Sequence, residues 1–231
     1  MGILDFFKKK PGSERASSSY KYVDTGFHGD RYLLEVVEFL ANNGTEIFIE
    51  TGTNVATTLS FVAKKYPHLQ CFSCEPDPVA FELATKHTAG FSNVMVFNLM
   101  SQDFIKMLKG SHPDLFKKKT IFWLDAHSHG FDWPLKEEVK FVVENFEKAY
   151  LMIDDFKVPG KEMFRYDSYK EQLCAHEFIV NEIGSRSYQL FYPGYIEKTS
   201  QHHPLQGWAL YVFGENLNFP ERLRSNVSEV K

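Results

Sequence analysis

The fold can be recognised from one segment, Ile47-Phe48-Ile49-Glu50-Thr51-Gly52-Thr53-Asn54. Three apolar residues, typical of a short buried strand, are followed by a polar turn that contains a single glycine. After the turn, apolar residues recur at helical spacing from Val55 to Tyr66, and Pro67 ends the pattern. A strand, a loop and a helix in this order form the first half of a βαβ unit, so the segment indicates an α/β protein.

The same alternation extends on both sides of this segment. Before it, Asp30 can cap a helix whose apolar stripe ends at Asn43-Gly44. After it, the pattern predicts strands at residues 70–75, 94–98, 120–125 and 150–154, a helix near 168–183, and aromatic-rich strands at 187–192 and 208–213. We therefore expect a three-layer αβα Rossmann-like sandwich. Its sheet is mostly parallel and seven-stranded, and it ends in a C-terminal antiparallel hairpin.

The length of the chain points to a single domain with two tails. Of its 231 residues, 43% are apolar, which is enough to build one sizeable core. Residues 1–29 are predicted to form an N-terminal tail that is partly flexible, because proline, glycine and serine gather between residues 11 and 19. Residues 30–218 then form the domain, and residues 219–231 form a C-terminal tail.

The bulk composition excludes several classes of function. A net charge of −4 and a pI near 6.1 give no basic excess for a phosphate backbone, so we expect a small-molecule partner and no nucleic acid. No run of about eighteen apolar residues is present, and no stable membrane anchor is expected. Three cysteines without a disulfide-like spacing, and no apolar leader, indicate a cytoplasmic protein. The sequence is compatible with a homo-oligomer.

Polar residues follow the predicted strands, at the edge of an open α/β sheet where ligands bind. In the first loop, Gly52 permits a sharp turn, and Thr53 and Asn54 can offer donors at the start of a helix. A single glycine and the lack of a Walker lysine disfavour NAD and nucleoside triphosphates as ligands. Glu75, roughly twenty residues further on, can accept hydrogen bonds from ribose hydroxyls. The alternative is a plain turn beside a surface acid.

These residues resemble the class I, or Rossmann-like, S-adenosylmethionine-dependent methyltransferases from about Glu46 to Phe213. The segment from Glu50 to Thr53 is similar to the family's first motif, Glu75 is similar to its ribose-binding acid, and Ser101-Gln102-Asp103 lies where its adenine contacts usually fall. Where the family has further glycines, this chain has Asn54, Val55 and Ala56. The resemblance implies S-adenosyl-L-methionine as cofactor, with contacts from Glu50, Gly52, Thr53, Asn54, Glu75, Pro76, Ser101 and Asp125.

Three carboxylates are predicted to meet at the same edge of the sheet. Asp125 ends one predicted strand, and Asp154 and Asp155 end the next. Carboxylates brought this close repel one another unless a cation compensates, and hard oxygen ligands suit Mg²⁺ or a similar divalent ion. The spacing resembles the metal site of O-methyltransferases of the catechol and macrolide-sugar type. The alternative is that Asp125 or Asp155 merely caps the segment that follows it.

The resemblance also implies a general base shortly after the first aspartate. His127 is the first candidate and His129 the second, because an imidazole with a pKa of about 6.5 suits proton abstraction near neutral pH. Both can instead be ordinary polar loop residues. We expect S-adenosylmethionine-dependent methyl transfer to a hydroxyl of a small-molecule acceptor, with metal assistance. The alternatives are a metal-independent transferase of aminopropyl or N-methyl groups, and a non-catalytic nucleoside-binding or scaffold module.

Overall fold

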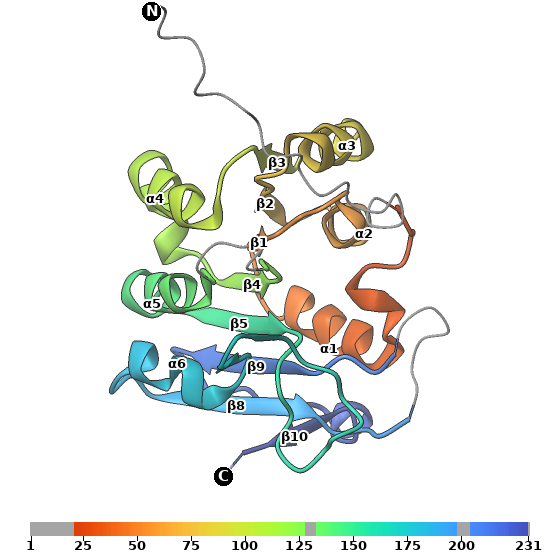
Figure 1. Cartoon of the computed structure of the whole chain (residues 1–231), viewed down its shortest axis with the longest axis vertical. Coiled ribbons are helices and arrows are strands. Elements are labelled where there is room, and N and C mark those ends of the chain that lie inside the picture. Colours follow the sequence, from red (N-terminus) through yellow and green to blue (C-terminus); the bar gives the residue numbers. More distant parts are fainter. Residues whose placement is uncertain (1–20, 128–132, 198–203, 231) are drawn as a thin grey trace, which may run out of the picture.

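The computed structural model describes residues 21–127, 133–197 and 204–230. An eight-stranded mixed sheet lies between two groups of helices (Figure 1), in the strand order β10-β8-β9-β5-β4-β1-β2-β3. The three-layer α/β architecture predicted from the sequence is therefore confirmed. The sheet has one strand more than the seven predicted, and this eighth strand comes from the end of the chain.

Five parallel strands form the half of the sheet that carries the predicted site. They are β1 (Ile47–Thr51), β2 (Gln70–Cys74), β3 (Val94–Phe97), β4 (Thr120–Leu124) and β5 (Ala149–Asp154). Every residue of β1, β4 and β5 is buried, as expected for parallel strands covered on both faces. The chain runs outward from β1 to β3 and then returns to β4 on the other side of β1, so the strand order reverses between β1 and β4.

Helices cover both faces of the sheet. The helices α1 (Arg31–Asn42), α2 (Thr57–Lys65) and α3 (Pro78–Thr88) lie on one face, and α4 (Ser101–Ser111), α5 (Leu135–Asn145) and α6 (His176–Ile183) lie on the other (Figure 1). The predicted cap of α1 is present, because the Asp30 carboxylate accepts hydrogen bonds from the Tyr32 and Leu33 amides. Among the described residues, no helix combines the length and apolar character that crossing a membrane requires.

The C-terminal part of the sheet is antiparallel. β8 (Tyr188–Pro193) pairs with β9 (Trp208–Phe213), and β9 pairs with β5, which confirms the predicted hairpin. The helix predicted near 168–183 is too long, because α6 begins only at His176. The preceding residues form a small hairpin of β6 (Ser168–Tyr169) and β7 (Gln172–Leu173). Its turn places Lys170 at φ 58°, a left-handed backbone conformation that a right-handed helix excludes.

Both segments predicted as tails contain residues that are folded against the sheet. At the C-terminus, β10 (Val227–Glu229) pairs with β8, and the 3₁₀ helix η4 (Glu221–Leu223) buries Leu223 completely. At the N-terminus, the 3₁₀ helix η2 (Phe27–Gly29) inserts Phe27 into the core, where its ring lies 4.8 Å from that of Trp123. Residues 1–20 of the predicted N-terminal tail and Lys231 lie outside the described residues.

The burial of Leu223 makes the role of the C-terminal segment testable. We expect Leu223→Ala to lower the free energy of unfolding by about 2 to 4 kcal/mol, because it leaves a cavity under the segment. Leu173→Ala is the matched control, since Leu173 is 36% exposed and its truncation should cost less than about 1 kcal/mol. Urea unfolding of both variants measures the difference, and equal costs would show that the segment is not part of the folded domain.

Candidate active site

The predicted site lies at the carboxyl edge of the parallel strands. The strand register places Thr51 of β1 beside Cys74 of β2 and Leu124 of β4, and Leu124 beside Ile153 of β5. The residues that follow these positions therefore emerge at the same edge of the sheet. Because the strand order reverses between β1 and β4, this is the edge position at which open α/β sheets bind ligands.

The loop after β1 passes so close to the loop after β4 that a side chain cannot fit between them. Gly52 has a φ of +81°, and a Cβ atom at this position would lie 2.3 Å from the carbonyl oxygen of Asp125. Asn54 and Ala56 also adopt left-handed conformations, with φ of 49° and 63°. They occupy two of the positions at which the methyltransferases that the sequence resembles have further glycines. The loop thus follows a glycine-like path, at a conformational cost of roughly 1 to 2 kcal/mol for a residue such as alanine.

Glu75 is held against this loop by backbone amides. Its Oε2 atom accepts a hydrogen bond from the Asn54 amide at 2.7 Å, and its Oε1 atom accepts one from the Asp77 amide at 2.9 Å. The amides of Gly52 and Thr53 donate to the carbonyl oxygen of Cys74, at 3.1 and 3.0 Å. The structure therefore brings Glu75 and the glycine loop together, as predicted. The backbone amides of Thr53 and Asn54, which were expected to face a ligand, donate instead to oxygen atoms of Cys74 and Glu75.

Glu50 lies beneath the loop. Its Oε2 atom accepts hydrogen bonds from the hydroxyl groups of Thr53, at 2.6 Å, and Ser73, at 2.9 Å. Burial raises the pKa of Glu50 to about 7, although these two hydrogen bonds act in the opposite direction. Glu50 thus fixes the shape of the loop from below.

The remaining predicted cofactor residues lie further along the same edge. Ser101, at the start of α4, is buried, and its hydroxyl group donates a hydrogen bond to Glu138 of α5. Pro76 is exposed, and its carbonyl oxygen accepts a hydrogen bond from the Asn98 side chain at 3.2 Å. Pro76 therefore belongs to the turn that follows β2, whereas Ser101 is held by α5, and neither is tied to the Gly52 loop by a described hydrogen bond.

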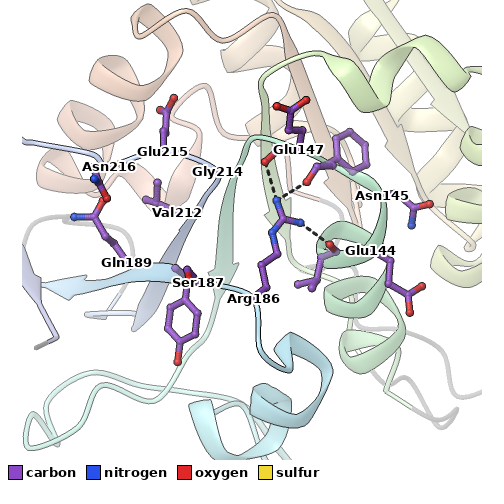
Figure 2. A pocket seen from close by; sticks show the side chains of 13 residues that line it. Glu144, Asn145, Glu147, Arg186, Ser187, Gln189, Val212, Gly214, Glu215 and Asn216 are labelled. Carbon is purple, nitrogen blue, oxygen red and sulfur yellow. Dashed lines mark hydrogen bonds between the residues drawn. The ribbon is translucent and has the colours of Figure 1, made fainter.

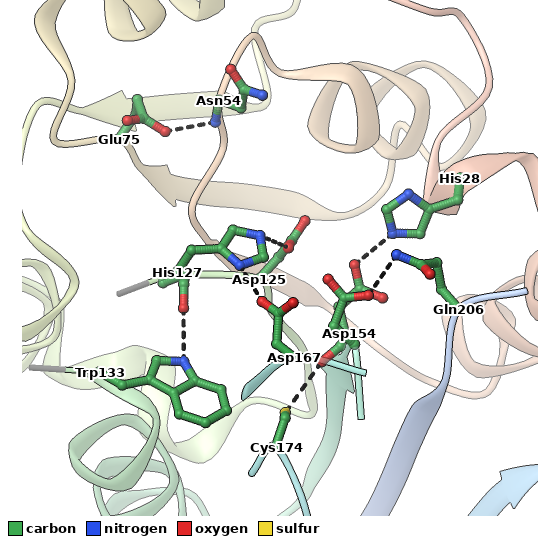
Figure 3. Close-up of polar contacts among 12 residues, drawn as sticks. His28, Asn54, Glu75, Asp125, His127, Trp133, Asp154, Asp167, Cys174 and Gln206 are labelled. Atoms are coloured by element: carbon green, nitrogen blue, oxygen red, sulfur yellow. Dashed lines mark hydrogen bonds and ion pairs between the residues drawn. The ribbon is translucent and has the colours of Figure 1, made fainter. Parts of the chain in front are cut away.

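An acidic cluster occupies the edge beyond β4 and β5 (Figure 3). Asp125, His127 and Asp155 each offer one donor atom, and these three atoms lie within 4.8 Å of one another. Asp125 and Asp155 are thus brought together as predicted, and His127 joins them. Asp154 belongs to a different contact, because its Oδ2 atom lies 2.6 Å from Nε2 of His28. The compact donor set is therefore Asp125, His127 and Asp155, whereas the sequence predicted Asp125, Asp154 and Asp155.

His127 is clamped between two carboxylates. Its Nε2 atom lies 3.2 Å from Asp125, and its Nδ1 atom lies 2.6 Å from Asp167 and 3.0 Å from the hydroxyl group of Tyr169. Burial lowers the pKa of His127, but the hydrogen bonds with Asp125 and Asp167 outweigh it and raise the pKa to about 12. An imidazolium cannot accept a proton, so this arrangement favours a role in holding the carboxylates over the predicted role as base. The second candidate, His129, lies outside the described residues.

The pKa shifts of the carboxyl groups show that the cluster is short of positive charge. Burial and then the neighbouring Asp154, Asp125 and Asp167 together raise the pKa of Asp155 to about 8. The pKa of Asp125 is also raised, by burial and then by Asp154. In addition, the Oδ1 atom of Asp154 is buried and has no hydrogen-bond partner among the described residues. Hard oxygen donors in this state fit a divalent cation, which would relieve the repulsion between them.

Three site residues were missed by the sequence analysis. His28 comes from the predicted tail, Asp167 from the segment between β5 and β6, and Gln206 from the residues before β9. The Gln206 amide nitrogen donates to Oδ1 of Asp155 at 2.6 Å. None of the three follows a strand or belongs to a periodic segment, so no local signal marks them.

A broader groove of about 730 Å³ lies elsewhere on the molecule (Figure 2). It is lined by the end of α5, the start of β8 and the residues after β9, at the edge of the sheet opposite the acidic cluster. Arg186 donates hydrogen bonds there to the carbonyl oxygens of Val143, Phe146 and Glu147. These bonds satisfy carbonyl groups at the C-terminus of α5, so Arg186 has a structural role. We assign the functional site to the edge that carries the acidic cluster, because the carboxylate and imidazole side chains converge there.

Comparison with known proteins identifies the fold. No family model and no curated protein matches the sequence of this chain. Among solved structures, a putative O-methyltransferase from Klebsiella pneumoniae superposes with a TM-score of 0.59 at 14% identity, covering 85% of this chain and 84% of that one. The O-methyltransferase from Bacillus cereus, solved in complex with SAH, gives 0.57 at 12% identity, with 85% of each chain covered. The O-methyltransferase TomG from Streptomyces achromogenes, involved in tomaymycin synthesis and solved in complex with SAM, gives 0.54 at 14% identity, covering 80% and 79%. The chain has the Rossmann-like fold of class I methyltransferases, as predicted.

The raised pKa of Glu50 predicts a dependence of stability on pH. The protonated carboxyl group is favoured in the folded state, so the contribution of Glu50 to stability is full below its ordinary pKa of 4.5 and is lost as the pH rises through about 7. Glu50→Gln cannot ionise. Its stability relative to wild type should therefore increase by about 2 kcal/mol between pH 5 and pH 8, as measured by urea unfolding. The exposed Glu82→Gln is the control, and a parallel pH profile for both variants would contradict the assignment.

Proposed function

We propose that this chain, which has the fold of class I methyltransferases, transfers a methyl group from S-adenosylmethionine to a hydroxyl group of a small molecule, with assistance from a divalent metal ion. One observation carries the proposal. The Gly52 loop, Glu75, Asp125 and Asp155 follow β1, β2, β4 and β5 and meet at the edge where the strand order reverses. Two structurally similar O-methyltransferases were solved with SAH and with SAM, which supports this cofactor.

Glu75 is the proposed ribose-binding residue. The Asn54 and Asp77 amides orient its carboxylate beside the glycine loop, and a carboxylate has about four lone-pair sites for hydrogen bonds. Because these two hydrogen bonds already hold the Glu75 side chain beside the loop, it would not have to move there when the nucleoside binds. The backbone of residues 52–56 would follow the nucleoside closely, because Gly52 leaves no side chain in the way.

Asp125 and Asp155 are the proposed ligands of the metal ion, with His127 beside them. Two carboxylates suit Mg²⁺ or Mn²⁺, and His127 would add a nitrogen ligand, which favours a transition-metal ion, only after losing its proton. When bound, such an ion would lower the pKa of a hydroxyl group of the acceptor. The chain's own residues position the donors, because Gln206 holds Asp155 and Asp167 holds His127. His127 would become a proton acceptor only after losing one of its two carboxylate partners.

A metal-independent transferase is the second candidate. The observation that favours it is the pairing of His28 with Asp154 and of His127 with Asp125 and Asp167, because two imidazolium groups already balance part of the negative charge. In that case, the same edge would bind the nucleoside, and transfer of a methyl group to nitrogen or of an aminopropyl group would need no ion. Dependence of turnover on a divalent metal distinguishes the two candidates.

Calorimetric titration with S-adenosylhomocysteine tests the cofactor assignment. We expect wild type to bind it and Glu75→Gln to bind it at least tenfold more weakly, because the variant loses one acceptor for the ribose hydroxyls. Glu82→Gln, an exposed acid on α3, is the matched control and should bind like wild type. Absence of binding to wild type would refute the proposed function, and equal binding by Glu75→Gln would refute the role of Glu75.

Methylation of a catechol, 3,4-dihydroxybenzoate, with and without EDTA tests the metal assignment. We expect EDTA to abolish turnover, Mg²⁺ or Mn²⁺ to restore it, and Asp155→Asn to lower it at least a hundredfold while S-adenosylhomocysteine still binds. Methylation that is insensitive to EDTA and to Asp155→Asn would refute the metal site and favour the metal-independent candidate.

A further inference from the structure

A strained turn brings His28 to the acidic cluster. Phe27, His28 and Gly29 have φ values of 51°, 57° and 69°, so three consecutive residues of η2 adopt the left-handed conformation. Only glycine adopts this conformation without steric cost, and a phenylalanine and a histidine therefore need contacts that hold them in it. Such a backbone persists only where the surrounding structure imposes it, and it is often found at functional sites.

The backbone of this turn is fixed on both sides of His28. Before it, Phe27 is completely buried beside Trp123, and the Phe27 amide donates a hydrogen bond to the hydroxyl group of Thr58 at 3.2 Å. After it, the Asp30 amide donates to the carbonyl oxygen of Phe27 at 3.0 Å, and α1 begins. The main chain therefore holds His28 beside the cluster, and its side chain makes the contact.

The imidazole of His28 forms an ion pair with the cluster. Its Nε2 atom lies 2.6 Å from Oδ2 of Asp154, and the two side chains are 25% and 3% exposed. Figure 3 shows His28 on the side of Asp154 opposite to His127. Burial lowers the pKa of His28, but the charge of Asp154 and the hydrogen bond with it outweigh burial and raise the pKa to about 10. His28 is therefore an imidazolium at neutral pH.

The positive charge of His28 also acts on the proposed metal ligands. Burial and the neighbouring aspartates raise the pKa values of Asp125 and Asp155, and the charge of His28 opposes this rise. Asp154, its ion-pair partner, lines the same cavity as these two carboxylates. An imidazolium and a metal ion that neutralise the same carboxylates repel each other, so each weakens the binding of the other.

We propose that His28 is a built-in competitor of the divalent ion, and that an ion bound at Asp125 and Asp155 releases the imidazolium and takes Asp154 as a further ligand. The inference rests on the metal site of the proposed function. His28 is not one of the three clustered donors, so its departure removes no ligand atom. Its partly exposed side chain can turn toward solvent while the backbone stays fixed. Wild type therefore binds the ion more weakly than its carboxylates alone would.

Binding of Mn²⁺ to the metal-free chain tests the competition, with the free ion measured by electron paramagnetic resonance. We expect His28→Asn to bind Mn²⁺ at least tenfold more tightly than wild type, because the opposing charge is removed. Asparagine tolerates the left-handed conformation, so the turn can keep its backbone. Equal or weaker binding by His28→Asn would overturn the proposal.

His68→Asn is the matched control for this measurement. His68 is an exposed histidine just before β2, at the edge of the sheet opposite the acidic cluster. Its replacement removes the same type of side chain and should leave the affinity for Mn²⁺ unchanged. An equal gain of affinity in both variants would show that the effect is not specific to His28 and would also overturn the proposal.

A double substitution shows whether the competition acts through Asp154. In the Asp154→Asn background, the carboxylate for which His28 and the ion compete is missing. Adding His28→Asn to that background should therefore tighten Mn²⁺ binding less than threefold. A full tenfold gain there would show that His28 acts independently of Asp154, which contradicts the proposed competition.

The wild-type chain allows the release to be observed directly. Nitrogen-15 NMR of labelled histidines distinguishes an imidazolium that is hydrogen-bonded to a carboxylate from one in water, and diamagnetic Mg²⁺ leaves the signals sharp. We expect the His28 signals to move to the positions of a solvated ring as Mg²⁺ saturates the site, while the His68 signals stay constant. His28 signals that do not move at saturation would overturn the proposal.

Titration of the same chains with S-adenosylhomocysteine separates this inference from the proposed function. If wild type binds the nucleoside and Mn²⁺ but His28→Asn gains no affinity for Mn²⁺, the competitor is refuted and metal-assisted methyl transfer stands. If His28→Asn gains affinity for Mn²⁺ but neither chain binds the nucleoside, the competitor stands and the proposed function is refuted. Absence of Mn²⁺ binding from both chains would refute the metal site together with its competitor.

Discussion

The close approach of the Gly52 backbone to the carbonyl group of Asp125 is the contact on which the rest of the site depends. It joins the loop after β1 to the loop after β4 at the point where the strand order reverses. Glu75 is anchored to the first loop, and the acidic cluster begins with the second. Because no side chain separates these two loops, the proposed nucleoside site and the acidic cluster lie side by side.

The second feature of the site is an excess of buried negative charge. Aspartates from three segments meet beside β4 and β5. His28 is paired with one of them, Asp154, and His127 is paired with two, Asp125 and Asp167. Such a cluster is costly for folding, since burial and mutual repulsion raise the pKa values of Asp125 and Asp155. Retaining that cost is typical of sites that bind a cation, and the proposed metal ion would offset it.

The sequence predicted those parts of the molecule that repeat a local pattern. The strands from β1 to β5, the loop glycine and Glu75 follow from periodicity, turn chemistry and spacing, because parallel strands must end at one edge. The partners of the acidic residues could not be found in this way. His28, Asp167 and Gln206 reach the site from segments without a periodic pattern, and their contacts join residues 40 to 126 positions apart. Likewise, β10 was read as a tail because three residues are too few to show a strand period.

Calorimetric titration of Gly52→Ala with S-adenosylhomocysteine tests the central claim most directly. A methyl group at this position would collide with the Asp125 carbonyl group and push the two loops apart, whereas the control Gly110→Ala adds a methyl group to open space on α4. Circular dichroism establishes that both variants are folded. The account predicts that Gly110→Ala binds the nucleoside like wild type and that Gly52→Ala binds at least tenfold more weakly. A folded Gly52→Ala variant with wild-type affinity would contradict it.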